Sequence, residues 1–199
     1  MVLDYSMMQW VLSIVLGLSY SRFINTITLL ARKRHQIKFD FLLISNLIGM
    51  IMGITHLWFR SPGFFNSVEG KHLPFMLVFS VCLIYVTALE CLLPSTTLLE
   101  SNDTIDLREI YFNQKNMFYV AMFVLGLVIL TLYIFYPEVD GLGFKMSSKI
   151  ATFSVHIVLV IMLPAILVIS NNYYLHVLNM VLVLLNFVSE IVTYAITMK

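Results

Sequence analysis

Apolar residues fall into six long stretches separated by short polar segments, and this pattern predicts six transmembrane helices. The stretches cover residues 9–31, 39–59, 73–93, 117–136, 148–169 and 173–195. Each reaches the roughly 20 residues that a helix needs to cross about 30 Å of hydrocarbon. Helices are expected because hydrocarbon leaves no other way for a single segment to satisfy its backbone. The sequence therefore predicts an all-α polytopic membrane protein, one bundle over residues 1–199 without a soluble domain.

The longest polar segment, residues 94–116, connects the third and fourth stretches and is expected on the inner side of the membrane. Asp103 is placed to cap a short helix, with Asp106 in its first turn. Leu107, Ile110 and Tyr111 then recur on one helical face. We expect a short amphipathic helix on the inner membrane surface. It is either a plain connector or a docking surface for a protein partner.

The composition supports a lipid-embedded chain. Hydrophobic residues make up 60% of the sequence and charged residues 12%, against roughly 45–50% and 25% in soluble domains. The net charge of +1 excludes a basic nucleic-acid-binding protein. The lipid bilayer is therefore the partner that the composition implies.

Positive charge directly after the first stretch predicts the orientation. Arg32, Lys33, Arg34 and Lys38 form a cluster there, and basic loops stay on the cytoplasmic side. The N-terminus is thus expected outside, and six spans return the C-terminus to the same side. Asp4, rather than a basic residue, precedes the first stretch, which argues against a cleaved signal peptide.

Two further features concern helix packing. Small residues recur every four positions, at Ser13, Gly17 and Ser21 and again at Gly49 and Gly53. This spacing predicts close contact between helix backbones within the bundle, with a homo-oligomer interface as the alternative. Pro164 predicts a kink in the fifth stretch.

Ionisable residues within the spans are the most informative ones, because burial in lipid is costly. Arg22 and Glu90 lie about 19 and 25 Å below the outer ends of their helices. An arginine side chain covers that difference, so we expect an Arg22–Glu90 ion pair. It is either a structural contact that sets the helix register or a charge-binding or gating site.

A polar stripe on the sixth stretch defines a second candidate site. Its members share one helical face: His176, Asn179, Asn186, Glu190 and Thr193. His56 and His156, on other stretches, are expected to face the same interior. The stripe is either a polar pathway that includes a Glu–His proton relay, or a set of ordinary interhelical hydrogen bonds.

The sequence offers little support for an enzyme. Its one Glu-x-x-His motif, Glu69 to His72, falls in a loop, and no His-Glu-x-x-His is present. Neither Gly-x-Ser-x-Gly nor Ser-x-x-Lys occurs. We therefore assign no catalytic residue, no metal ligand and no cofactor.

Four motifs carry a family resemblance. They are Leu29-Leu30-Ala31-Arg32-Lys33-Arg34, Trp58-Phe59, Leu92-Leu93-Pro94 and Asp106-Leu107-Arg108-Glu109-Ile110-Tyr111-Phe112. Over its first four stretches the chain resembles a loose set of small uncharacterised bacterial multi-pass membrane proteins. The resemblance implies a bacterial plasma membrane and no particular chemistry.

Three functions stay open at this point. The first is a non-enzymatic membrane component, namely a scaffold, a sensor or a subunit of a membrane complex, acting through helix packing and the 94–116 segment. The second is a small transporter or channel, proton-linked through the polar stripe. The third is an intramembrane metal-dependent enzyme, which would require residues such as His56, His156, His176 and Glu190 to converge on one ion.

Overall fold

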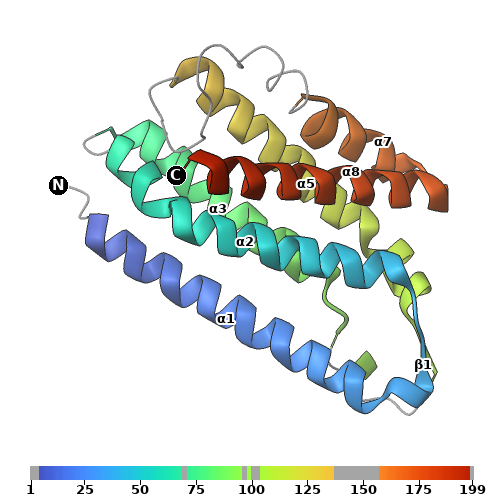
Figure 1. The fold of residues 1–199 in the computed structure, drawn as a ribbon. Helices are drawn as coiled ribbons and strands as arrows, with labels where there is room; N and C mark the ends of the chain where they lie inside the picture. Colours follow the sequence, from blue (N-terminus) through green and yellow to red (C-terminus); the bar gives the residue numbers. More distant parts are fainter. Residues whose placement is uncertain (1–4, 69–70, 96–97, 100–103, 137–156, 198–199) are drawn as a thin grey trace.

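The computed structural model describes residues 5–68, 71–95, 98–99, 104–136 and 157–197, and these residues are mostly helical. The long helices are α1 (Tyr5–Arg32), α2 (Phe41–Ser67), α3 (His72–Leu92), α5 (Leu107–Phe135) and α8 (Tyr173–Thr197). They run back and forth along one bundle, so α1 begins at the end where α8 finishes (Figure 1). The predicted helical class is confirmed.

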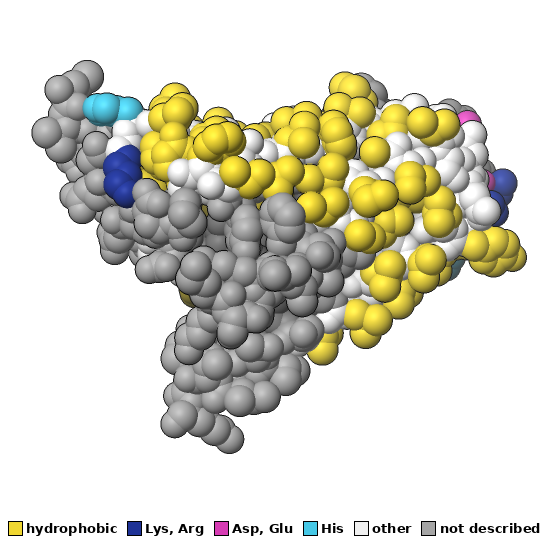
Figure 2. Space-filling model, turned by 90° about the horizontal axis from the view of Figure 1, so that it is seen from above, with side chains coloured by type: hydrophobic (Ala, Val, Ile, Leu, Met, Phe, Trp, Pro, Cys, Tyr) yellow, Lys and Arg dark blue, Asp and Glu magenta, His cyan; other side chains and the backbone are white. Residues whose placement is uncertain are grey.

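Four of the described helices are long and apolar enough to cross a membrane. The apolar segments are Trp10–Arg32, Phe41–Phe59, His72–Leu92 and Leu107–Leu132. In the face shown in Figure 2, hydrophobic side chains gather over the middle, and coloured charged and histidine side chains lie toward the ends. This is the distribution that a lipid-embedded bundle needs. The first part of the predicted fifth span, residues 148–156, lies outside the described residues.

A two-stranded parallel sheet closes the bundle at the end opposite the chain termini (Figure 1). Strand β1 (Ile37–Lys38) follows the short 3-10 helix η1 (Arg34–Gln36) and pairs with β2 (Ile105–Asp106). An ion pair between Lys38 and Asp106, 3.7 Å apart, reinforces the pairing. We call this end the sheet end. The hydrophobic pattern did not predict the sheet, because two-residue strands carry no periodicity.

The structure differs from the sequence-based expectation for the 94–116 segment. Its described residues from Leu107 onward belong to α5, which runs unbroken from Leu107 to Phe135 instead of forming a short helix that ends before residue 117. Asp106 caps it, since its carboxylate accepts hydrogen bonds from the backbone N–H groups of Arg108 and Glu109. Asp103, expected as the cap, lies outside the described residues. The apolar face that begins at Leu107 is buried in the core rather than resting on a membrane surface.

The predicted irregularity at Pro164 takes a specific form. Residues Ile157–Met162 form a π-helical segment, η4, which continues as the α-helix α7 (Leu163–Ile169). Proline has no backbone N–H and its ring clashes with the carbonyl four residues earlier, so a regular helix cannot continue through it unchanged. A wider π turn is one of the recognised ways to accommodate such a break.

Helix α2 extends past its apolar span Phe41–Phe59, which agrees with the predicted second stretch, and continues through Pro62 to Ser67. The close helix contacts expected at small residues are not found at two of them. Neither Gly17 nor Gly49 marks a close helix contact, because a β-carbon built on either one would have no neighbouring atom within 4 Å. The tight interior is made instead by large side chains, including the fully buried Leu42, Leu47 and Leu89.

Candidate functional site

Helix α3 ends well inside the bundle. The side-chain amide of Gln114 donates a 3.5 Å hydrogen bond to the backbone oxygen of Leu93, just after the last residue of α3. Gln114 lies seven residues into α5, so α3 stops about 10 Å short of the sheet end. Leu93, Pro94 and Leu99 are buried there. A chain that leaves a helix at this depth must be covered by protein, because lipid cannot satisfy its backbone.

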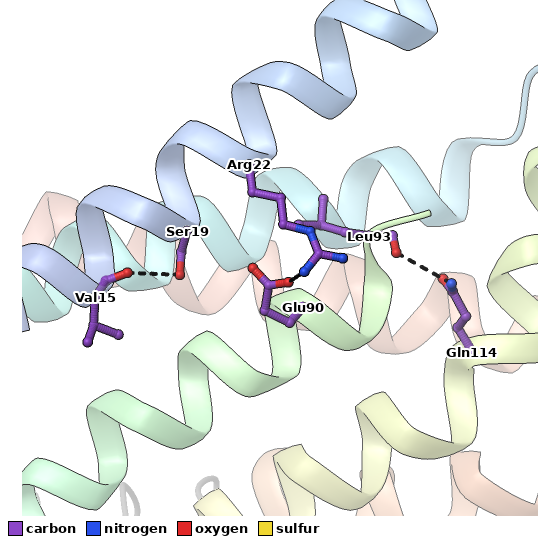
Figure 3. A network of polar contacts seen from close by, with 6 residues as sticks. All are labelled: Val15, Ser19, Arg22, Glu90, Leu93 and Gln114. Carbon is purple, nitrogen blue, oxygen red and sulfur yellow. Dashed lines mark hydrogen bonds and ion pairs between the residues drawn. The ribbon is translucent and has the colours of Figure 1, made fainter. Parts of the chain in front are cut away.

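The predicted ion pair sits beside this helix end. In Figure 3, Arg22 extends from α1 to the Glu90 carboxylate on α3, and Gln114 approaches Leu93 nearby. The Arg22 side chain is 48% exposed and that of Glu90 28%. The structure thus brings the two predicted residues together, and the contact joins α1 to α3. Whether it gates or binds anything stays a prediction.

Tyr20 connects α1 to α2 through polar contacts. The Tyr20 hydroxyl bonds the hydroxyl of Thr55 on α2. Hydroxyl contacts between membrane helices contribute modestly, about 0.6 kcal/mol each on average. Charged and hydroxyl contacts therefore help to hold α1, the most outlying of the long helices in Figure 1, against the bundle.

A second polar cluster lies in the core between α5 and α8. His176 is completely buried, and its Nδ1 atom lies 2.8 Å from the Tyr111 hydroxyl. The Tyr111 hydroxyl is also 2.8 Å from the hydroxyl of Tyr119. The imidazole makes edge contacts with the rings of Tyr111 and Phe112, at centroid distances of 5.4 Å. We call His176, Tyr111 and Tyr119 the histidine–tyrosine cluster.

The geometry fixes the direction of these hydrogen bonds for a neutral imidazole. The Nε2 atom of His176 lies 2.9 Å from the Ser170 carbonyl oxygen, which can only accept, so Nε2 carries the hydrogen. Nδ1 is then an acceptor, and Tyr111 donates to it. The Tyr111 oxygen in turn accepts from Tyr119. All these hydrogen bonds therefore point the same way: Tyr119 donates to Tyr111, Tyr111 donates to His176, and His176 donates to the carbonyl of Ser170, which follows α7.

Lys115 anchors the same region from the neighbouring turn of α5. Its ammonium group donates to the backbone oxygens of Leu167 and Val168 at 3.1 and 3.0 Å, and to the Asn116 side chain at 3.1 Å. Those carbonyls belong to the last turn of α7, where a helix has unsatisfied acceptors and a partial negative charge. A lysine that is 3% exposed is therefore compatible with the core, because it caps a helix.

Arg108 extends the contact between the helices toward the sheet end. Its guanidinium carbon lies 4.6 Å from the centroid of the Tyr173 ring, at the first residue of α8. A cation over an aromatic face contributes about 0.5–1 kcal/mol at an exposed site. The starts of α5 and α8 are thus fixed to each other.

Part of the predicted polar stripe can be compared with the structure. His176 and Asn179 are both buried on α8, next to Tyr119. His56, on α2, is not brought to them: it lies about 23 Å from the start of α2, while His176 lies about 5 Å from the start of α8. His156 and the side chains of Asn186, Glu190 and Thr193 lie outside the described residues.

The sequence interpretation missed three members of this region, namely Tyr111, Lys115 and Tyr119. Tyr111 was expected on a short surface helix, and Lys115 and Tyr119 fell on either side of the boundary placed at residue 117. Their spacing of four residues puts them on one face of a helix. That regularity was the signal available in the sequence.

No metal centre is visible in the part of the chain that the structure describes: no three His, Cys, Asp or Glu side chains there are grouped to hold an ion. Comparison with protein-family models, curated proteins and solved structures gives no match to this chain. Function must therefore be argued from the geometry above.

Proposed function

We propose that the protein is a non-enzymatic membrane component, a scaffold, sensor or subunit of a membrane complex. The proposal is based on the hydrogen bonds made by the deeply buried polar groups, namely the histidine–tyrosine cluster and Lys115. They bond to one another and to helix ends, and so lock α5, α7 and α8 together. Polar groups committed in this way favour a rigid bundle over an open pathway.

The membrane and the orientation belong to the same proposal. We propose six spans, the fifth being the predicted stretch that contains α7 and the sixth α8. The basic cluster Arg32–Lys38 supports an orientation with the sheet end on the cytoplasmic side of a bacterial plasma membrane and the N-terminus outside. Exposed residues of the 94–116 segment, such as Arg108 and Glu109, supply the contact surface for a protein partner or a second copy.

A flux measurement tests this proposal. The purified protein is reconstituted into liposomes that contain a pH-sensitive dye, and an acid pulse is applied with potassium and valinomycin to balance charge. We expect the proton flux to equal that of protein-free liposomes. A flux that Tyr111→Phe abolishes and Tyr174→Phe preserves would contradict the proposal, because Tyr174 is 82% exposed and lies outside the cluster.

The second candidate is a proton-linked transporter, and one observation favours it. The directed hydrogen bonds run from Tyr119, deep in the bundle, through Tyr111 and His176 to Ser170, next to the exposed Asn171. Chains of this kind carry protons in membrane pumps. The flux outcome described above would establish this candidate in place of the first.

A further inference from the structure

A partly enclosed space lies between the helices of the bundle, next to the histidine–tyrosine cluster. It is a cavity of about 60 Å³ between α2, α3, α5, α7 and α8. Its apolar wall includes Met50, Phe118 and Met180. Its polar wall includes Ser45, Asn46, Tyr119 and Asn179.

Several polar groups of the wall already donate a hydrogen bond elsewhere. Ser45 donates its only hydroxyl hydrogen to the Phe41 carbonyl, and Asn46 donates to the Leu42 carbonyl at 2.8 Å. Tyr119 donates to Tyr111. Ser45 and Tyr119 therefore retain only oxygen lone pairs, whereas the Asn46 amide keeps an acceptor oxygen and a second N–H.

Asn179 is the residue that points to a ligand. It is 5% exposed, and its Oδ1 atom is buried without a hydrogen-bond partner among the described residues. Buried polar atoms are nearly always satisfied by protein, water or a ligand, because an unmatched one keeps its full desolvation cost. An unpaired acceptor in the wall of a cavity therefore favours a ligand that carries a hydrogen-bond donor.

We propose that this cavity binds a small neutral solute that donates an N–H or O–H hydrogen bond to Asn179, a primary amide being the simplest case. The volume corresponds to about two to four water molecules, which matches a solute of about four non-hydrogen atoms. None of the described side chains that line the cavity is charged, so among them an ionic ligand would lose its hydration without compensation. The inference rests on the proposed function and narrows it to a sensor, since the ligand contacts five helical elements at once.

Binding of acetamide, which has four non-hydrogen atoms, tests the proposal. The full chain in lipid nanodiscs is titrated with acetamide and followed by saturation-transfer NMR. We expect saturable transfer to the wild type and an affinity weaker by about tenfold or more in Asn179→Leu, which removes the acceptor.

Two glycine variants provide a matched pair. A β-carbon at Gly49, in the cavity wall, or at Gly17, on α1 away from the cavity, meets open space within 4 Å. Both Gly49→Ala and Gly17→Ala are therefore expected to fold. Gly49→Ala fills part of the cavity and should weaken acetamide binding, whereas Gly17→Ala should bind like the wild type.

The outcomes separate the inference from the function on which it rests. Equal acetamide binding by the wild type, Asn179→Leu and Gly49→Ala would overturn the inference. A folded wild-type protein that binds no acetamide would overturn it too, because its cavity would then hold only water. In both cases an absence of proton flux leaves the scaffold or subunit function standing. Proton flux that depends on Tyr111 would overturn the proposed function itself, whatever the acetamide result.

Discussion

The Tyr111 hydroxyl makes two buried hydrogen bonds, one to His176 on α8 and one to Tyr119 on α5 itself, so Tyr111→Phe is the most informative single change. The substitution removes one oxygen and keeps the ring and its edge contacts with His176. It leaves the Nδ1 acceptor of His176 and the O–H donor of Tyr119 without their main partner. The Tyr119 hydroxyl lies 3.4 Å from the same nitrogen, which offers only a long replacement bond.

The expected cost follows from these two bonds. A buried group left unsatisfied costs about 1–3 kcal/mol in a soluble protein. Interhelical hydrogen bonds in a membrane protein average about 0.6 kcal/mol, with a maximum near 1.7. Two buried hydrogen bonds, one between helices and one within α5, both 2.8 Å long and inaccessible to solvent, therefore predict a loss of about 2 kcal/mol, or roughly a 30-fold shift in the unfolding equilibrium.

Reversible unfolding in mixed micelles with increasing dodecyl sulfate measures this free energy. Tyr174→Phe is the matched control, because it removes a hydroxyl from an exposed tyrosine on the same helix as His176. A ¹⁵N spectrum of the histidines checks the assigned tautomer at the same time. His176 should show a bare Nδ1 and a protonated Nε2.

Two results would refute this reasoning. The first is a free energy of unfolding for Tyr111→Phe equal to that of the Tyr174→Phe control. The second is a His176 spectrum with the hydrogen on Nδ1, since Tyr111 would then accept rather than donate. Either result would mean that the histidine–tyrosine cluster does not hold α5 and α8 together as described.

Three further predictions concern the other polar contacts. Lys115→Met should cost about 2 kcal/mol, because it exposes helix-end carbonyls to the core, and should speed amide exchange at the end of α7. In a double-mutant cycle, Arg22→Gln and Glu90→Gln should show a coupling of at least about 1 kcal/mol, since lipid screens the pair less than water does; additive effects would contradict the ion pair. Asp106→Ala should cost about 1 kcal/mol through loss of the helix cap, measured by the same unfolding titration with the exposed Glu109→Ala as control.

Length and hydropathy were sufficient to predict helices and the membrane setting, because lipid imposes a minimum length of apolar residues on any helix that crosses it. Depth counting along α1 and α3 also brought Arg22 and Glu90 to one level. Both inferences depend only on helix rise and solvent, which are properties of each segment taken alone. The Pro164 irregularity was predictable for the same reason, since proline lacks the backbone N–H that a regular helix turn uses, whatever surrounds it.

The extent of α5 could not be read in this way. A polar run precedes the predicted fourth span, and such a run in isolation indicates a loop. It consists of Asn113, Gln114, Lys115 and Asn116. In the folded chain Lys115 caps α7 and Gln114 binds the end of α3. These polar residues therefore lie within a helix, because partners distant in sequence satisfy their hydrogen bonds. The sequence alone does not show those partners, so the same residues suggest the end of a helix.

The sequence by itself determined that this chain forms apolar helices and which of its charges are costly in lipid. The tertiary structure decided what those polar groups do: it paired His176 with two tyrosines, joined β1 to β2 across more than sixty residues of chain, and left Asn179 facing a cavity. The physical reason is that hydropathy is a local property of a segment, whereas hydrogen-bond partners and empty volume exist only once helices distant in sequence are packed side by side.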